Sequence, residues 1–209
     1  MESNLKAEIA RRQIGTALAL FIADDDPVSV HCLACGGGEL ADYLAKAAGE
    51  TAFSQHALNE FPEMKRNELQ TLRNKYWNAM KHASTLNGKV RSDNELLSQF
   101  DDSHNDHVLF IAWHDYTSAT GSMPIEAQVF QAWYFANFPE KLALQVDASG
   151  YENIFPNIQA MKRSEKKRLL RRRIEWVRKN KDVMNHPKTD RRKLILGRAS
   201  APLPVISLP

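Results

Sequence analysis

The sequence predicts an all-α protein, a helical bundle followed by a long basic C-terminal helix and an irregular tail. Apolar residues recur at intervals of three and four along most of the chain, which is the spacing of one helix face. Capping residues and helix-stopping residues separate these stretches. The sequence contains neither a β-hairpin signal nor an alternation of strand and helix patterns, so it argues against a sheet-based fold.

The chain is predicted to begin with two helices, over residues 3–23 and 27–48. Asp26 is a typical helix N-cap, and Pro27 is a typical first helical residue. Gly49 follows the second stretch, at a position where helices commonly end.

The clearest helix is predicted for residues 63–84, where apolar side chains recur at helical spacing and polar ones lie between them. A short helix capped by Ser54 is expected before it. Ser92 opens a capping box ahead of the next helix, and Ser103 opens a weaker one. Pro124 is expected to start the last helix of the bundle.

The chain is predicted to divide into three parts. Residues 1–148 form the bundle, residues 149–184 a basic helical extension, and residues 185–209 an irregular tail with four prolines. A single long helix is expected over residues 164–184. Residues 193–196 could add a short strand or dock as an extended arm.

Charge is unevenly divided along the chain, although its 209 residues carry a net charge of only +3. Residues 1–160 contain 12 Lys/Arg and 21 Asp/Glu, a balance of −9. Residues 161–209 contain 16 Lys/Arg and 4 Asp/Glu, a balance of +12. This asymmetry indicates a polyanionic partner such as nucleic acid, or docking of the basic end on an acidic body.

Basic side chains that could hold a nucleic acid strand are concentrated between residues 162 and 193. Clustered Lys and Arg neutralise phosphates and release counterions, and Trp176 could stack on a base. Docking on the body or on a protein partner is the main alternative, followed by a membrane surface or plain solvation. The candidate nucleic-acid-binding residues are Lys167, Arg168, Arg171, Arg172, Arg173, Arg178, Arg191 and Arg192.

The apolar segment over residues 14–23 superficially resembles part of a signal peptide. Three aspartates follow it and no small-residue cleavage pattern closes it, so a buried helix is the better interpretation. No apolar run reaches the roughly 18 residues that a transmembrane helix needs. We therefore expect a cytoplasmic protein that does not contact the membrane.

One face of the helix predicted for residues 63–84 carries groups suited to acid–base chemistry. At about 100° per residue, Lys75, Asn78 and His82 fall within roughly 60° of one another. An imidazole can accept and return a proton near neutral pH, and a lysine can hold a phosphate. These groups would suit transesterification of RNA without a metal or other cofactor. The alternative interpretation is a solvated helix face, or polar contacts between helices.

The run Leu72–His82 resembles the motif that HEPN domains carry late in their helical bundle. Many members of that family are dimeric, metal-independent ribonucleases of toxin–antitoxin or phage-defence systems. On this resemblance Arg73 matches the family's arginine, Asn74 its polar residue and His82 its histidine. The resemblance implies a homodimer that associates with RNA rather than DNA.

The distance between Arg73 and His82 departs from the family pattern. They are nine positions apart, which is farther than usual, and nine helical steps bring them to opposite sides. Either Lys75 and Asn78 act with the histidine in place of Arg73, or the domain is a non-catalytic relative of the family. The candidate catalytic residues are His82, Asn78, Lys75 and Arg73.

Two further clusters could carry chemistry, and each has a structural alternative. Cys32 and Cys35, followed by three glycines, could be a redox pair or half a zinc site, but close helix packing is favoured. The stretch 101–107, with His104 and His107, could bind a divalent cation, but capping of a helix start is favoured.

Three hypotheses follow for the whole protein. The first is an RNA-associated, HEPN-like protein with metal-independent cleavage of RNA as its candidate activity. The second is a non-catalytic interaction or dimerisation protein whose basic end binds nucleic acid or a protein. The third is a metal-dependent enzyme built on His104, His107 and the neighbouring aspartates.

Overall fold

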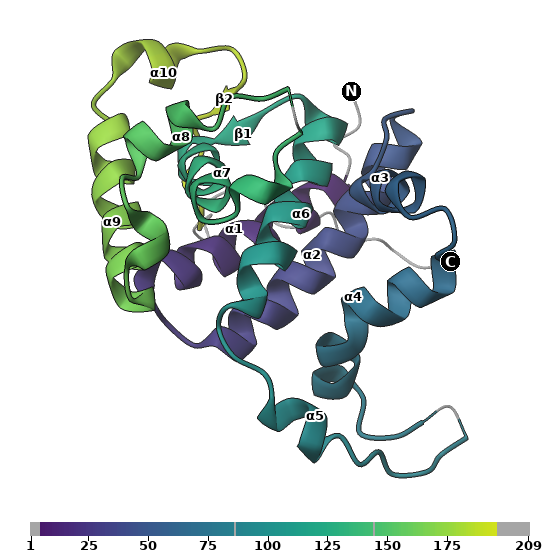
Figure 1. Ribbon diagram of the computed structural model, residues 1–209. Coiled ribbons are helices and arrows are strands. Elements are labelled where there is room, and N and C mark those ends of the chain that lie inside the picture. Colours follow the sequence, from purple (N-terminus) through teal and green to yellow (C-terminus); the bar gives the residue numbers. More distant parts are fainter. Residues whose placement is uncertain (1–4, 86, 144, 196–209) are drawn as a thin grey trace.

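The computed structural model describes residues 5–85, 87–143 and 145–195, and it confirms the all-α class (Figure 1). Three long helices form its centre. Helix α2 (Pro27–Ala47) packs against α1 (Leu5–Ala23) and against α6 (His104–Thr120). In the described residues the sheet consists of two strands of two residues each.

The remaining elements lie on two sides of this centre (Figure 1). Helices α4 and α5 form a projection on one side, whereas α7 to α10 cover the other. These elements are α3 (Phe53–Glu60), α4 (Arg66–Lys81), α5 (Asn94–Ser98), β1 (Met123–Pro124), α7 (Ile125–Asn137), α8 (Ser149–Ile154), α9 (Arg163–Val177), α10 (Lys181–Asn185) and β2 (Thr189–Asp190), with short 3-10 turns at Pro139–Lys141 and Ile158–Ala160.

The glycines of α2 allow the central helices to approach closely. A Cβ at Gly37 would lie 2.5 Å from Cγ2 of Ile14, and one at Gly38 would lie 3.2 Å from Cβ of Ala112. A larger residue would force α1 or α6 away from α2. Close packing, favoured from the sequence, is therefore the role of these two glycines.

A single buried cluster joins the bundle to the C-terminal part of the chain. Its large members include Trp113 of α6 and Trp133 of α7, both of which are almost fully buried. Leu170 and Ile174 of α9 and Leu194 of the following segment belong to the same cluster. The thin apolar stripe of the basic segment is thus part of the main core.

The prediction of a single long helix over residues 164–184 is wrong. Helix α9 ends at Val177, and the chain turns before α10 begins at Lys181. The side chain of Asn180 causes the restart, because it accepts hydrogen bonds from the backbone N–H of Asp182 (3.0 Å) and of Val183 (3.3 Å).

The predicted start of α2 is confirmed, but some of the other predicted helix starts are not. Asp26 accepts hydrogen bonds from the first turn of α2, as expected. Ser54 does not cap α3 but lies inside it, and its hydroxyl donates to Asp42 (2.5 Å). Ser103 directly precedes α6, but its hydroxyl accepts no hydrogen bond from the first turn and donates to Asp101 instead. Pro124 lies one residue before α7.

The segment after α10 docks on the bundle through Arg11, a fully buried arginine of α1. Its Nε donates to Oδ2 of Asp190 (2.9 Å), and its Nη1 donates to the carbonyl of Leu194 (3.3 Å). Strand β2 also pairs in parallel with β1. The arm predicted for residues 193–196 therefore docks as far as Ile195, while Leu196 lies outside the described residues.

Within the part of the chain that the structure describes, no helix is both long and apolar enough to cross a membrane.

The contacts of Asp190 predict acid-sensitive docking of this segment. Burial opposes ionisation, but hydrogen bonds from Arg192 and Arg11 outweigh it and lower the pKa of Asp190 to about 2. Because the folded pKa is depressed, the stabilisation is present above about pH 4 and is lost as the pH falls toward 2. After allowance for solvent screening it contributes on the order of 1–2 kcal/mol.

Asp190→Asn should therefore lower the free energy of unfolding by about 1–2 kcal/mol at pH 6 and by almost nothing at pH 2, measured by urea unfolding. Glu60→Gln, at an exposed position, is the control and should change neither value. A deficit that stays constant across this pH range would show that the carboxylate is not the stabilising group.

Candidate functional site

Helix α4 does not bring the predicted catalytic groups together. Lys75 and His82 are exposed, and Asn78 is half-buried. The helix ends at Lys81, and His82 follows with an extended backbone (φ −118°, ψ 116°), so it leaves the helical face that Asn78 occupies. Among the described residues, no side-chain hydrogen bond or ion pair links any two of Lys75, Asn78 and His82. The ammonium of Lys75 instead lies 4.6 Å from the ring centroid of Tyr76.

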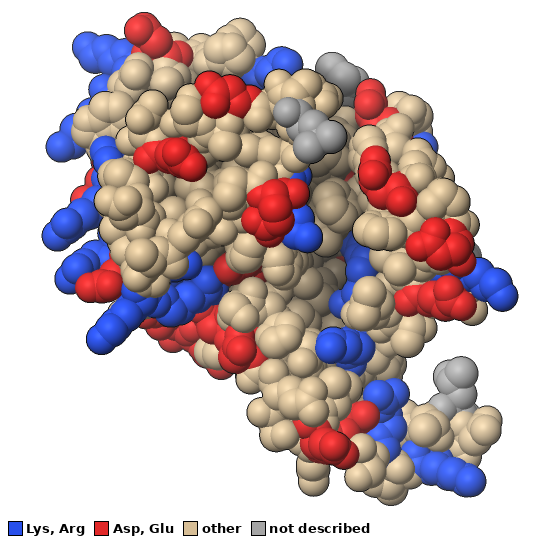
Figure 2. Space-filling model, viewed as in Figure 1, with Lys and Arg blue, Asp and Glu red and all other residues tan. Residues whose placement is uncertain are grey.

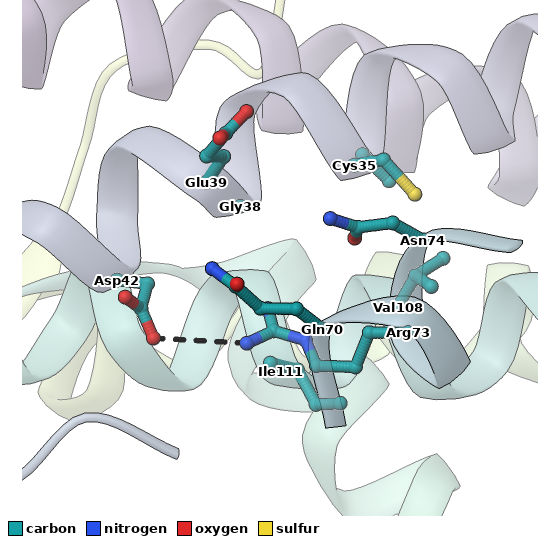
Figure 3. A pocket seen from close by; sticks show the side chains of 10 residues that line it. Cys35, Gly38, Glu39, Asp42, Gln70, Arg73, Asn74, Val108 and Ile111 are labelled. Carbon is teal, nitrogen blue, oxygen red and sulfur yellow. Dashed lines mark ion pairs between the residues drawn. The ribbon is translucent and has the colours of Figure 1, made fainter. Parts of the chain in front are cut away.

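Arg73 and Asn74 lie elsewhere, in a small polar pocket between α2, α4 and α6 (Figure 3). The cavity measures about 70 Å³. Nη1 of Arg73 is 3.6 Å from Oδ1 of Asp42, and Cys35 lines the opposite part of the pocket. Arg73 thus faces the interior beside α2, whereas His82 is exposed beyond the end of α4.

The electrostatics of this pocket favour a structural role. Burial alone would raise the pKa of Asp42, but hydrogen bonds from Lys46 and Ser54 and the nearby Arg73 lower it. Burial raises the pKa of the Cys35 thiol to about 12. The pocket therefore holds an ion pair and a protonated thiol, and its volume accepts water or a small ion rather than a nucleotide.

The pocket residues Cys35, Asp42 and Gln70 could not be identified as neighbours of Arg73 from the sequence. Asp42 lies 31 positions before Arg73, on another helix, and its surroundings in the sequence match no motif. In the sequence, Cys35 stands out only as half of a C-x-x-C pair. No signal in the sequence indicates this meeting of α2 and α4.

The acidic stretch before α6 is used for contacts within the protein. Asp102 and Asp106 accept from Arg163, and His107 Nδ1 lies 2.8 Å from the hydroxyl of Tyr134. His104 packs against the ring of Tyr76, with centroids 4.6 Å apart. In the described residues no three His, Cys, Asp or Glu side chains are grouped as metal ligands, so the third hypothesis loses its site.

The inner face of α9 is held to the body by ion pairs. Arg163 contacts Asp106 through two nitrogens, at 2.6 and 2.7 Å, and its Nε lies 2.8 Å from Oδ2 of Asp102. The ammonium of Lys167, only 1% exposed, lies 2.6 Å from Asp102 and 2.9 Å from Asp24. Burial raises the pKa of Asp106 despite the adjacent guanidinium. Docking on the body, one of the alternatives in the sequence, therefore accounts for these cations.

Three other predicted nucleic-acid-binding residues also contact the body. Arg171 donates to the carbonyl of Ile22 at the end of α1 (2.6 Å). Arg178 is paired with Glu126 of α7. Arg192 is paired with Asp190 (2.9 Å) and with a glutamate of α1. Since each guanidinium already has an oxygen partner, none is fully available to a phosphate.

The opposite face of α9 carries the exposed side chains of Arg168, Arg172 and Trp176, and the exposed Lys179 follows in the turn after the helix. We name these four residues the outer row. The first three are four positions apart and so lie along one line of the helix. Trp176 is 61% exposed, which is high for so large an apolar side chain. Lys and Arg side chains project along the edge of the molecule where α9 lies (Figures 1 and 2). No described residue forms an ion pair with any of the three cations.

Of the two remaining predicted residues, Arg191 is exposed and Arg173 is half-buried. The Nε atom of Arg173 is buried without a hydrogen-bond partner in the described part of the chain. The predicted set is thus divided: Arg168, Arg172 and Arg191 face solvent freely, whereas Lys167, Arg171, Arg178 and Arg192 hold the fold together.

Comparisons with protein-family models, with curated proteins and with solved structures found no match to this chain. The HEPN resemblance therefore stays a prediction from the motif.

Lys167 and Arg168 are adjacent in sequence but differ in burial, which gives a matched test of the docking. Lys167→Met should lower the free energy of unfolding by about 1–2 kcal/mol, because it removes the buried ammonium that bridges the half-buried Asp102 and the exposed Asp24. Arg168→Met should change it by no more than about 0.5 kcal/mol. Urea unfolding of both variants measures the difference, and equal effects would contradict the inward orientation of Lys167.

The raised pKa of Cys35 predicts a slow thiol. With Cys32 replaced by serine, alkylation by iodoacetamide at pH 7.5 should be at least about 100-fold slower in the folded protein than in urea, because little thiolate is present. Mass spectrometry follows the reaction. Alkylation of the folded protein at the rate seen in urea would mean that the pocket is open and the thiol reactive.

Proposed function

We propose that this protein binds single-stranded RNA along the outer row of α9. The observation that carries the proposal is the division of the basic segment into two faces. Its inner cations are paired with the body, yet Arg168, Arg172 and Lys179 have no acidic partner among the described residues. A nucleic acid strand carries both phosphates and aromatic bases. Unpaired cations beside an exposed indole can bind both of these groups.

The dimensions and chemistry of the outer row support a single strand. From Arg168 to Trp176 the helix rises about 12 Å, which is enough to contact a few nucleotides. An exposed indole can stack on an unpaired base, whereas the bases of a duplex are already stacked. Trp176 is exposed on the helix surface, where its ring can stack on any base, so little sequence preference is expected. RNA is preferred over DNA in this proposal only because of the HEPN resemblance.

The geometry of α4 supports a protein that binds RNA without cleaving it. Cleavage by the HEPN-type route would need a base and a cation at one phosphate, and His82 and Arg73 are separated by the second half of α4. The ribonuclease hypothesis makes a different prediction, namely cleavage of RNA in EDTA that stops in His82→Ala. Intact RNA after incubation with wild-type protein would favour binding alone.

The proposal includes a cytoplasmic location, where single-stranded RNA is abundant. It does not require the homodimer that the resemblance implies, because the outer row lies on one chain. Sedimentation with and without RNA distinguishes a monomer with one site from a dimer with two.

Substitutions in the outer row test the proposal directly. Trp176→Ala should weaken binding of a fluorescein-labelled 12-nucleotide uridine RNA by about 5- to 100-fold, since a base–aromatic stack contributes about 1–3 kcal/mol. Arg168→Gln/Arg172→Gln should weaken it at least tenfold at 100 mM salt. Fluorescence anisotropy gives both dissociation constants.

The matched control is Lys75→Gln/Lys81→Gln, which removes the same charge from two exposed positions on α4. It should change RNA affinity by less than about threefold. If the α4 variant loses as much affinity as the α9 variant, binding depends on net charge and the proposed site is wrong.

A further inference from the structure

A groove of about 650 Å³ lies beside α9, on a different flank from the outer row. It runs between α1, α7, α9, α10 and the segment that follows β2. Its volume falls in the range of about 300–1,000 Å³ that is usual for small-molecule sites. The proposal that follows is independent of RNA binding, because none of the four outer-row residues lines this groove.

The apolar lining of the groove is aliphatic. No Phe, Tyr or Trp contributes to it, so it offers no flat surface for an aromatic ring or a base. A flexible hydrocarbon chain fits such a surface better than a planar ring does. The apolar residues that line the groove are Ala19, Ile22, Ile125, Ile174, Met184, Leu194 and Ile195.

The rim of the groove has more free positive than free negative charge. Among its acidic groups, Glu126 is paired with Arg178, and Asp190 is paired with Arg11 and Arg192. Glu175 is the only acidic lining residue without an ion-pair partner in the described chain.

Two basic lining residues, Arg191 and Lys193, are exposed and likewise have no ion-pair partner among the described residues. Arg171 is a third basic lining residue without an ion-pair partner among the described residues, since its guanidinium contacts the neutral carbonyl of Ile22. The unpaired charges therefore leave an excess of two positive charges, which favours an anionic group on the ligand.

We propose that the groove binds a medium-chain aliphatic carboxylate, with the hydrocarbon chain along the apolar floor and the carboxylate beside Arg191 and Lys193. Aliphatic lining selects the chain, and the unpaired cations select the anionic head over a neutral or cationic one. A free carboxylate needs no membrane, so binding is expected from dilute aqueous solution.

Isothermal titration of the full chain with decanoate, well below its micelle concentration, tests the proposal. Decanoate should bind once per chain, and decanol and decyltrimethylammonium should bind at least tenfold more weakly. From hexanoate to octanoate to decanoate, affinity should rise by up to about tenfold per step, as burial of two further methylene groups predicts. No binding of decanoate at 1 mM, or equal binding of the three head groups, would overturn the proposal.

Two variants locate the site. Arg191→Gln/Lys193→Gln, at exposed positions, should weaken decanoate at least fivefold and leave decanol unchanged. Ala19→Phe should fill part of the groove and weaken both ligands, with far-UV circular dichroism showing that the fold is kept. Binding that is unaffected by both variants would place the ligand elsewhere and contradict the assignment.

A second copy of the chain is the competing occupant of this groove. Sedimentation of wild-type protein and Ala19→Phe without ligand tests it. A dimer that Ala19→Phe dissociates, and that excludes decanoate, would replace the proposed ligand with a second chain. A wild-type protein that stays monomeric and binds decanoate supports the proposal.

Discussion

The arrangement of the C-terminal half depends on one ionic contact, in which Arg163 and Lys167 of α9 meet Asp102 and Asp106 at the start of α6. Lys167 and Asp106 are almost completely buried, so each charge needs an opposite charge directly beside it. Rotation of α9 by even a quarter turn would leave these carboxylates without cations. The contact therefore sets which face of α9 looks inward and, by exclusion, which face meets solvent.

Arg11 acts in the same way on the segment after α10. Its guanidinium is fully buried and contacts one carboxylate and three backbone carbonyls of residues 190–194. Buried ion pairs contribute less to net stability than to orientation, since desolvation cancels much of their attraction. Together the two contacts explain why one chain has an acidic body and a basic C-terminal end. Many of the acidic side chains of the body are paired with basic side chains of that end.

The sequence predicted the parts of the fold that depend on local signals. The all-α class, the cap at Asp26 and the close approach at Gly37 and Gly38 each follow from residues within one helix or its edge. The break between α9 and α10 was missed, because Asn180 is a weak signal inside a long basic run. Arg163 and its partners lie about 60 positions apart in the sequence, and only the packing of α9 against α6 brings them together.

The candidate site shows the same limit. A count of charges identified the basic segment, but burial decides which of its cations a ligand can reach, and burial is a property of the packed structure. Lys167 and Arg168 both carry a positive charge, but Lys167 is buried and Arg168 is exposed. On α4, helical spacing placed His82 on the face of Asn78, whereas the helix ends one residue too early for that geometry to form.

The most direct measurement of the central claim is the salt dependence of RNA affinity. If only Arg168, Arg172 and Lys179 meet phosphates, the slope of log K against log salt concentration should be about −2, from roughly 0.7 per contact on a single strand. A slope steeper than about −5 would mean that the inner cations leave their carboxylates to bind RNA. That result would contradict the division of α9 into a docked face and a free one.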